Sequence, residues 1–466
     1  MLARQAKPAL QTIKTLKTIE NINSMQIKPN EKDIVDLLDR QSEIKNLTPI
    51  ILNVQAPLVL SLDSSWGTGK TTFVKMWRAY LQKEQKQSIY FNAWETDYAE
   101  DPLIVLVSEL DKWVKANNNP TRINQWTDKV KEALPKIAKR AAIAGVKAAT
   151  FGTLEIDKQM EGVAADLMGG LTSDLLDNFN KQSKAITEFK KILETVLDDL
   201  ADDQKNLIIF IDELDRCRPT YAIELLERIK HLFDINRIVF VLSTDMTQLA
   251  HSIKGVYGHE FDAKKYLQRF IDLDYSLKKP DNKTYIESQL NSIHFANRTT
   301  TEAQEAQQSI IECCNLMAKR FNLKLRDINQ LLMRISLISC SIPANNYFYA
   351  PLLISLLMLR DQNKELYERY AESPSVADEV IEFIDQGLSS EERQDRYFCL
   401  MSAHLIAPNR RERFDELIKP YKKAEESPDY DGNNKVSKLI DRISTTQGHK
   451  HTIERIEFLQ QFAMDA

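Results

Sequence analysis

The stretch that decides the fold of this chain reads Ser64-Ser65-Trp66-Gly67-Thr68-Gly69-Lys70-Thr71-Thr72. An apolar run over residues 57–62 precedes it, and a segment with helical spacing of apolar side chains, residues 73–81, follows it. A strand, a glycine-bearing loop and a helix in this order form a phosphate-binding loop. Backbone N–H groups in such a loop point inward and the helix N-terminus adds positive potential, so the stretch suits a polyphosphate.

The residue types in this loop predict individual roles. We expect Lys70 to reach the outer phosphates of a bound nucleotide, and the Thr71 hydroxyl to take one place on Mg²⁺. We expect the surrounding cradle to consist of Trp66, Gly67, Thr68, Gly69 and Thr72.

Ser64 departs from the usual pattern G-x-x-x-x-G-K-[ST], because it stands where the first glycine is expected. That position begins the turn, so the serine weakens the match without removing the cradle. The alternative interpretation is a chance Gly-Thr-Gly-Lys sequence in a surface turn. A second motif has to decide between the two.

Composition indicates a soluble globular protein of two or three domains. The chain has 466 residues, more than one ordinary core accommodates, with 43% hydrophobic and 28% charged residues. A net charge of −5 gives no global attraction to nucleic acid. The five cysteines are odd in number and lack metal-ligand spacing, which favours reduced thiols in the cytoplasm.

No segment of the sequence has the pattern of a signal peptide or a membrane span. Residues 1–30 lack a continuous apolar region, and we predict that they form an N-terminal arm. The best candidate span, residues 347–359, contains Pro351 and is too short to cross a bilayer, so we predict a buried helix there. We therefore expect a cytoplasmic protein without membrane contact.

Apolar periodicity divides the chain into an α/β part and an all-helical part. We predict a nucleotide-binding domain over residues 31–280, a helical domain over 281–423, and a polar loop with short terminal helices over 424–466. Residues 117–203 contain no convincing strand, which predicts a long helical insertion in the first domain. Within it, the basic stretch 129–147 suits either an anionic membrane surface or, as we favour, a solvated helix face.

A second motif supplies the partner that the phosphate-binding loop needs. Residues 206–212 form a continuous apolar run that ends in carboxylates, which is typical of a buried parallel strand. Asp212 is expected to hold Mg²⁺, and the adjacent Glu213 to orient and polarise the attacking water. Asp215 competes with them for either role. Merely solvated carboxylates at a strand end would not explain an apolar run that leads directly into Asp-Glu downstream of such a loop.

Thr244 and Asp245 end the next predicted strand, residues 237–243. Ligands of open parallel sheets bind beyond the carboxyl ends of the strands, so either residue is a candidate sensor of the terminal phosphate or of the attacking water. Equally, one of them can cap the helix that follows.

Five segments together closely resemble the signatures of the KAP family of P-loop NTPases. They are residues 66–71, 90–94 (Tyr-Phe-Asn-Ala-Trp), 211–217 (Ile-Asp-Glu-Leu-Asp-Arg-Cys), 239–245 and 266–270. The resemblance implies a P-loop NTPase fold, bound ATP and Mg²⁺, and a role in bacterial phage exclusion or defence. Family members commonly carry transmembrane helices inside the NTPase domain, whereas the insertion of this chain is too charged to span.

The resemblance extends into the helical part, where residues 325–331 match an Arg-Asp-Ile segment of the family. Arg326 is a candidate sensor that pairs with phosphate, since a guanidinium suits bidentate phosphate contacts. The alternative is a surface or capping pair with Asp327. Candidates for contacts in trans within an oligomer are Arg216, Arg218 and Arg269.

These motifs predict an ATP-hydrolysing switch or assembly module that forms a homo-oligomer or acts with a partner effector protein. Hydrolysis would proceed by metal-assisted attack of water on the γ-phosphate. One alternative is an ATP-binding scaffold with little turnover, which Ser64 supports. Another is an ATPase stimulated by nucleic acid, indicated by basic and aromatic residues at 410–423 that a solvated helix face explains more simply.

Overall fold

The computed structural model describes residues 36, 38–54, 57–138, 180–181, 183–198, 206–290, 300–342, 349–406 and 446–460. The chain divides into two compact units, Asn30–Lys278 and a helical unit that holds Lys279–Ala466, and each is described by itself. The predicted N-terminal arm and the basic residues at 410–423 lie outside the described residues.

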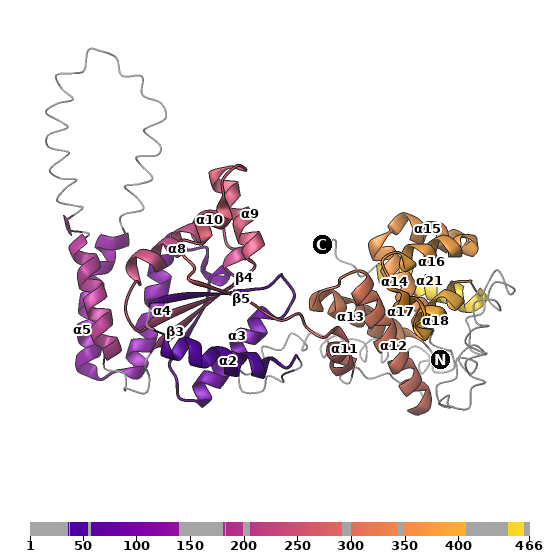
Figure 1. Cartoon of the computed structure of the whole chain (residues 1–466), viewed down its shortest axis with the longest axis horizontal. Coiled ribbons are helices and arrows are strands. Elements are labelled where there is room, and N and C mark those ends of the chain that lie inside the picture. Colours follow the sequence, from indigo (N-terminus) through magenta and orange to yellow (C-terminus); the bar gives the residue numbers. More distant parts are fainter. Residues whose placement is uncertain are drawn as a thin grey trace, which may run out of the picture. The chain divides into compact units, whose positions relative to one another are not determined.

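A five-stranded parallel sheet forms the centre of the first unit (Figure 1). Its strands are β1 (Leu58–Asp63), β2 (Ser88–Asn92), β3 (Leu207–Asp212), β4 (Ile238–Thr244) and β5 (Leu273–Ser276). They lie in the order β2-β3-β4-β1-β5, and every neighbouring pair is parallel. The predicted α/β class with a parallel sheet is therefore confirmed.

The burial of the strands follows their composition. β3 and β4 are buried along their whole length, as expected for apolar strands in the middle of a parallel sheet. The sequence did not predict β5, because its residues are largely exposed and lack an apolar run.

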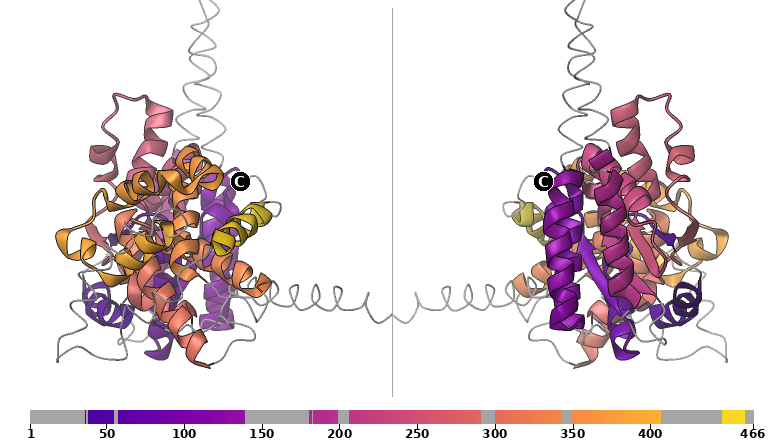
Figure 2. Two further views of the ribbon diagram at one scale, coloured as in Figure 1. Left: turned by 90° about the vertical axis from the view of Figure 1, so that its right-hand side faces the viewer. Right: turned by 90° about the vertical axis from the view of Figure 1, so that its left-hand side faces the viewer.

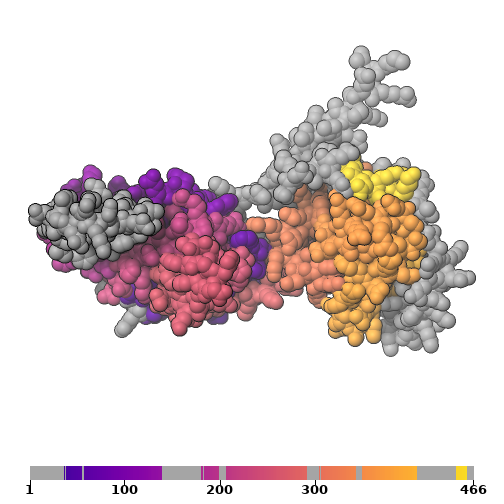
Figure 3. Space-filling view, turned by 90° about the horizontal axis from the view of Figure 1, so that it is seen from above, coloured from indigo at the N-terminus to yellow at the C-terminus, as the bar shows by residue number. Residues whose placement is uncertain are grey.

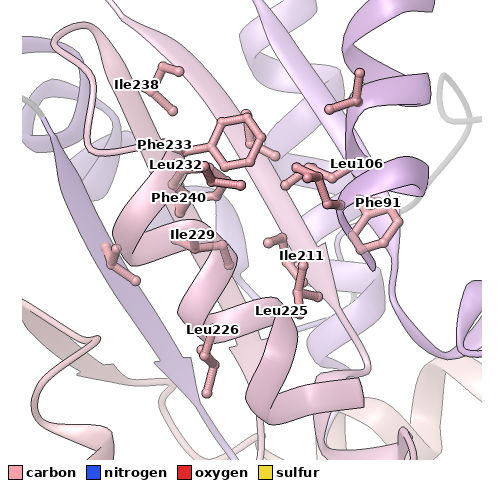
Figure 4. Packing of buried hydrophobic residues seen from close by; sticks show 14 of the residues in the cluster. Phe91, Leu106, Ile211, Leu225, Leu226, Ile229, Leu232, Phe233, Ile238 and Phe240 are labelled. Carbon is pink, nitrogen blue, oxygen red and sulfur yellow. The ribbon is translucent and has the colours of Figure 1, made fainter. Parts of the chain in front are cut away.

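Helices cover both faces of the sheet. Those that carry buried apolar faces are α2 (Arg40–Asn53), α3 (Lys70–Lys83), α4 (Pro102–Asn117), α8 (Pro219–Leu232) and α9 (Met246–Tyr257). Successive residues of a strand point to opposite faces, so Ile208 and Phe210 pack with α2 and α3. Ile209 and Ile211 belong instead to the cluster formed with α4, α8 and α9, part of which Figure 4 shows.

The described part of the insertion is helical. α5 (Pro120–Ala138) lies beside a helical segment over residues 183–198 (Figure 2), and Trp126 packs on Phe189 with ring centroids 6.0 Å apart. On α5, Ala133 and Ile137 are buried, whereas the lysines in the described part of the basic stretch are exposed. This arrangement is that of a solvated helix face. Among the helices that the structure describes, none is both long and apolar enough to cross a membrane.

α9 and α10 (Ala263–Leu267) form an exposed pair on the first unit (Figure 3). Tyr257 stacks on Phe261 with ring centroids 4.7 Å apart, and Tyr266 packs edge-on against Phe270 at 5.0 Å. Tyr257 of α9 also contacts Tyr266 of α10, with ring centroids 5.6 Å apart, and this contact links the two helices although Tyr257 remains 47% exposed.

The second unit is helical throughout its described residues. Its longer helices are α11 (Asn282–Leu290), α12 (Thr300–Arg320), α13 (Leu325–Ser341), α14 (Ala350–Gln362), α15 (Lys364–Glu372), α16 (Ala377–Asp385), α18 (Arg396–Ile406) and α21 (Thr446–Gln460). Residues 350–359 of α14 are all buried, and α12, α15, α18 and α21 pack around this helix. The short apolar segment is thus the buried helix that the sequence predicted.

Replacement of Trp77 tests the packing of α3 on the sheet. Its ring is fully buried between Phe73 and Phe210, and its indole N–H donates to the Thr48 hydroxyl of α2 at 2.9 Å. We expect Trp77→Ala to lower the free energy of unfolding by about 3–5 kcal/mol in urea denaturation. The control Ile104→Ala, at a side chain 47% exposed, should change it by about 0.5 kcal/mol or less. Equal effects would contradict this packing.

Candidate nucleotide site at the carboxyl edge of the sheet

The phosphate-binding loop lies between the end of β1 and the start of α3. Gly67 and Gly69 have φ angles of 78° and 91°, which glycine adopts without strain. Ser64 has no such angle, so the turn does not require glycine at that position. The Ser64 hydroxyl lies 2.7 Å from the Thr68 hydroxyl, and Thr68 donates to the Ser65 carbonyl. The Ser64 side chain thereby joins the two ends of the turn through a hydrogen bond.

Lys70 turns its ammonium group back into this loop. It donates to the Ser64 carbonyl and lies 4.0 Å from Oδ2 of Asp215, with its side chain 10% exposed. Burial lowers the pKa of Lys70, and the carboxylates around it, Asp215 first, oppose that shift. The Lys70 ammonium is the cation that a phosphate in this loop would attract, and it would have to leave the neighbouring carboxylates to meet the phosphate.

Asp212 ends β3 and is almost completely buried. Its Oδ1 accepts the backbone N–H of Glu213 at 3.0 Å, and its Oδ2 accepts the Tyr90 hydroxyl of β2 at 3.1 Å. Burial and the charge of Asp212 raise the pKa of Tyr90, so Tyr90 remains a donor. The two donors fix the orientation of the carboxylate.

Glu213 follows Asp212 in a left-handed conformation with φ of 61°. Its two oxygens have different partners: Oε1 pairs with Arg216 at 3.2 Å and Oε2 accepts the Asn92 amide at 3.4 Å. Arg216 in turn lies over the ring of Trp94, 5.3 Å from its centroid. Burial raises the pKa of Glu213 and the charge of Arg216 opposes this. A carboxylate with a raised pKa suits a general base.

Asp215 has other hydrogen-bond partners than Asp212 and Glu213 have. Its Oδ2 accepts the indole N–H of Trp66 at 2.5 Å and the backbone N–H of Asp245 at 3.0 Å. Trp66 comes from the loop after β1 and Asp245 from the start of α9, so one carboxylate joins three strand-end segments. The predicted catalytic or metal role of Asp215 stays a prediction.

Thr244 and Asp245 differ in what the structure assigns to them. The Asp245 carboxylate accepts the N–H groups of Thr247 and Gln248, both at 3.1 Å, and so caps α9. The Thr244 hydroxyl is buried and has no hydrogen-bond partner among the described residues. Capping is therefore the observed role of Asp245, and sensing by either residue stays a prediction.

Oxygen donors suited to Mg²⁺ come from two places, the Thr71 hydroxyl at the start of α3 and the Asp212 carboxylate. Mg²⁺ usually takes only one or two protein ligands when phosphates and water complete its shell. The described residues contain no group of three or more His, Cys, Asp or Glu side chains that could hold a metal. Two oxygen donors of this kind fit a metal whose other ligands are phosphate oxygens and water.

Residues 40–341 match the sequence pattern described as the KAP family P-loop domain, which is more than half of the chain. The chain belongs to this family. The loop at Ser64–Thr72 lies within the matched P-loop domain, so the interpretation as a chance surface turn is excluded.

One curated relative of this KAP protein is the phage T7 exclusion protein of Escherichia coli (strain K12). The two are 22% identical over 199 residues, which cover 41% of this chain and 26% of the relative. The matched region thus spans about a quarter of the relative's length.

Two solved structures also show a distant likeness to the KAP chain. The crystal structure of a DNA replication initiation factor has 11% identity and a TM-score of 0.31, and covers 91% of this chain and 97% of its own. The Aeropyrum pernix ORC2 protein, in ADPNP–ADP complexes, has 12% identity and a TM-score of 0.32, with coverage of 85% and 88%. These scores are too low to transfer a function.

Three residues of the KAP site have contacts that the sequence did not predict. Tyr90 and Asn92 of β2 hold Asp212 and Glu213, and Trp94 supports Arg216. All three belong to the Tyr-Phe-Asn-Ala-Trp segment, whose match to the family was the available signal. The contacts of this segment with Asp212 and Glu213 follow only from the pairing of β2 with β3.

The arginine candidates are in different surroundings. Arg218 is exposed and donates to the carbonyl groups of Asp97 and Ala99. Arg269 is exposed on the first unit, and Arg326 is exposed on α13 of the second unit. Their roles as sensor or as contacts in trans stay predictions.

Asp245→Ala tests the capping role. The variant removes the acceptor of two N–H groups at the start of α9, so the free energy of unfolding should fall by about 1 kcal/mol in urea denaturation. Asp245→Asn keeps an acceptor oxygen and should retain most of the stability. Equal losses in both variants would show that the cap is not what Asp245 contributes.

Proposed function

We propose that this KAP protein binds ATP with Mg²⁺ and hydrolyses it, acting as a nucleotide-dependent switch or assembly module in the bacterial cytoplasm during defence against phage. The observation that carries the proposal is the Lys70 ammonium inside a phosphate-binding loop, at the sheet edge where Asp212 ends β3 and Glu213 follows it. The defence role is supported by the likeness to the phage T7 exclusion protein. We further propose a homo-oligomer or a partner effector as the receiver of the signal.

In the proposed reaction, Lys70 moves from the Ser64 carbonyl and Asp215 to the outer phosphates. The N–H groups of the loop and of the first turn of α3 hold the remaining phosphate oxygens. Thr71 and Asp212 would hold Mg²⁺, which supplies positive charge against the phosphates.

Glu213 acts as the base in this scheme. The water oxygen forms a bond to the γ-phosphorus, the bond from that phosphorus to the bridging oxygen of ADP breaks, and the water proton passes to Glu213. The pKa of Glu213, raised by burial, makes the carboxylate a stronger base than an exposed glutamate.

A second candidate is an ATP-binding scaffold with little turnover. It is favoured by the contacts of Glu213, whose two oxygens are both engaged, one by Arg216 and one by Asn92. Glu213 has to give up one of these contacts before it can accept a water proton, so turnover is slow in this second candidate while binding is intact.

Two variants separate binding from hydrolysis. Lys70→Ala should weaken ATP binding by about tenfold or more, because a charge-assisted contact to phosphate is lost. Glu213→Gln should keep binding and lower kcat by about a hundredfold, because the base is lost. Calorimetric ATP titration and phosphate release measure the two effects, and Lys86→Ala outside the loop is the control. Hydrolysis at the wild-type level in both variants would exclude the proposed ATPase, and ATP binding without hydrolysis in the wild type would establish the scaffold.

Arg216→Gln should shift the pH dependence of hydrolysis. Arg216 lowers the pKa of Glu213, so its removal raises that pKa and the base stays protonated up to a higher pH. The acid limb of the kcat profile should therefore move to higher pH, whereas Arg216→Lys, which keeps the charge, should leave it close to that of the wild type. An unmoved acid limb in Arg216→Gln would exclude Glu213 as the titrating base.

A further inference from the structure

Asp215 has an unusual set of contacts on a single oxygen. Its Oδ2 accepts the Trp66 indole N–H and the Asp245 backbone N–H, and also lies 4.0 Å from Nζ of Lys70. The side chain is only 2% exposed. A buried carboxylate needs such donors and a counter-charge, because its charge is otherwise costly in a low-dielectric interior.

We propose that Asp215 is a positioning residue that takes the place of a phosphate toward Lys70 in the nucleotide-free protein, and therefore competes with the nucleotide for that cation. The inference rests on the proposed function, since it concerns the nucleotide that Lys70 binds. It differs from a metal or base role, in which Asp215 would assist the nucleotide instead of opposing it.

The competition follows from charge and burial. The Lys70 and Asp215 side chains are only 10% and 2% exposed, so solvent screens their attraction little. Without nucleotide, the contacts to the Ser64 carbonyl and to Asp215 hold the ammonium group inside the loop. When a polyphosphate enters, Lys70 has to leave Asp215, and the two anions then repel each other.

Trp66 stabilises the Asp215 carboxylate after Lys70 has left it. Its indole N–H and the Asp245 N–H remain as donors after the lysine leaves, and donors to a charged group are the stronger kind of hydrogen bond. Loss of the indole donor alone would bind Asp215 more firmly to Lys70. The two residues should therefore affect nucleotide affinity in opposite directions.

The test is calorimetric titration of the full chain with ADP in the presence of Mg²⁺. Asp215→Asn removes the competing charge at nearly constant shape, so ADP should bind about tenfold more tightly, or 1.4 kcal/mol. The matched control is Asp274→Asn on β5, an exposed carboxylate whose charge acts on Asp63. The affinity of Asp274→Asn for ADP should stay within about twofold of the wild type, as expected for a screened surface charge.

Trp66→Phe keeps the aromatic ring and removes only the N–H donor. It should bind ADP a few times more weakly than the wild type, and Asp215→Ser, which also removes the competing charge, decides the question if Asp215→Asn does not fold. A merely structural role for Asp215 would weaken binding in Asp215→Asn, so tighter binding is the distinguishing result.

The inference is overturned if wild-type protein binds ADP and Asp215→Asn binds no more tightly, if Asp274→Asn tightens binding equally, or if Trp66→Phe does not weaken it. Absence of ADP binding in the wild type and in every variant would instead overturn the proposed function, and this inference with it.

Discussion

Side chains on both faces of β3 and β4 are buried, so a shift of either strand by one residue would exchange the side chains that fill the two cores on either side of the sheet. The core thereby fixes the register in which Asp212 lies opposite Ser243 and Asp63 opposite Thr244. Parallel strands end at one edge, and the loops that follow them meet there. The distances in the nucleotide site are therefore a consequence of packing far from it.

The sequence predicted the parts of this arrangement that local pattern controls. An apolar run leading into Asp212 is visible without a structure, and so is a lysine directly after Gly69. Local pattern could not predict the contacts between residues of different strands. Asn92 meets Glu213, and Trp66 meets Asp215, only because segments distant in sequence are joined through the sheet. β5 was missed because it lies at the sheet edge and needs no apolar pattern.

Charge in the site is unbalanced. Carboxylates from β1, β3 and the start of α9 surround the Lys70 ammonium, and the pKa of Asp63 is raised by burial and by its neighbours Asp274 and Asp245. Such a surplus would repel a free polyphosphate, and in the proposed ATP complex a divalent cation bound to the nucleotide would reduce this repulsion. Mg²⁺ held by Thr71 and Asp212 would thus offset negative charge as well as take up oxygen ligands.

The five tryptophans of the chain are divided sharply by solvent contact. Trp77, Trp113 and Trp126 are buried, whereas Trp66 is 43% and Trp94 50% exposed. Both exposed rings belong to the nucleotide site, one bonded to Asp215 and the other beneath Arg216. A neutral aqueous quencher such as acrylamide would thus reach mainly these two indoles. The protein carries its own optical probes, and they are placed where its chemistry is expected.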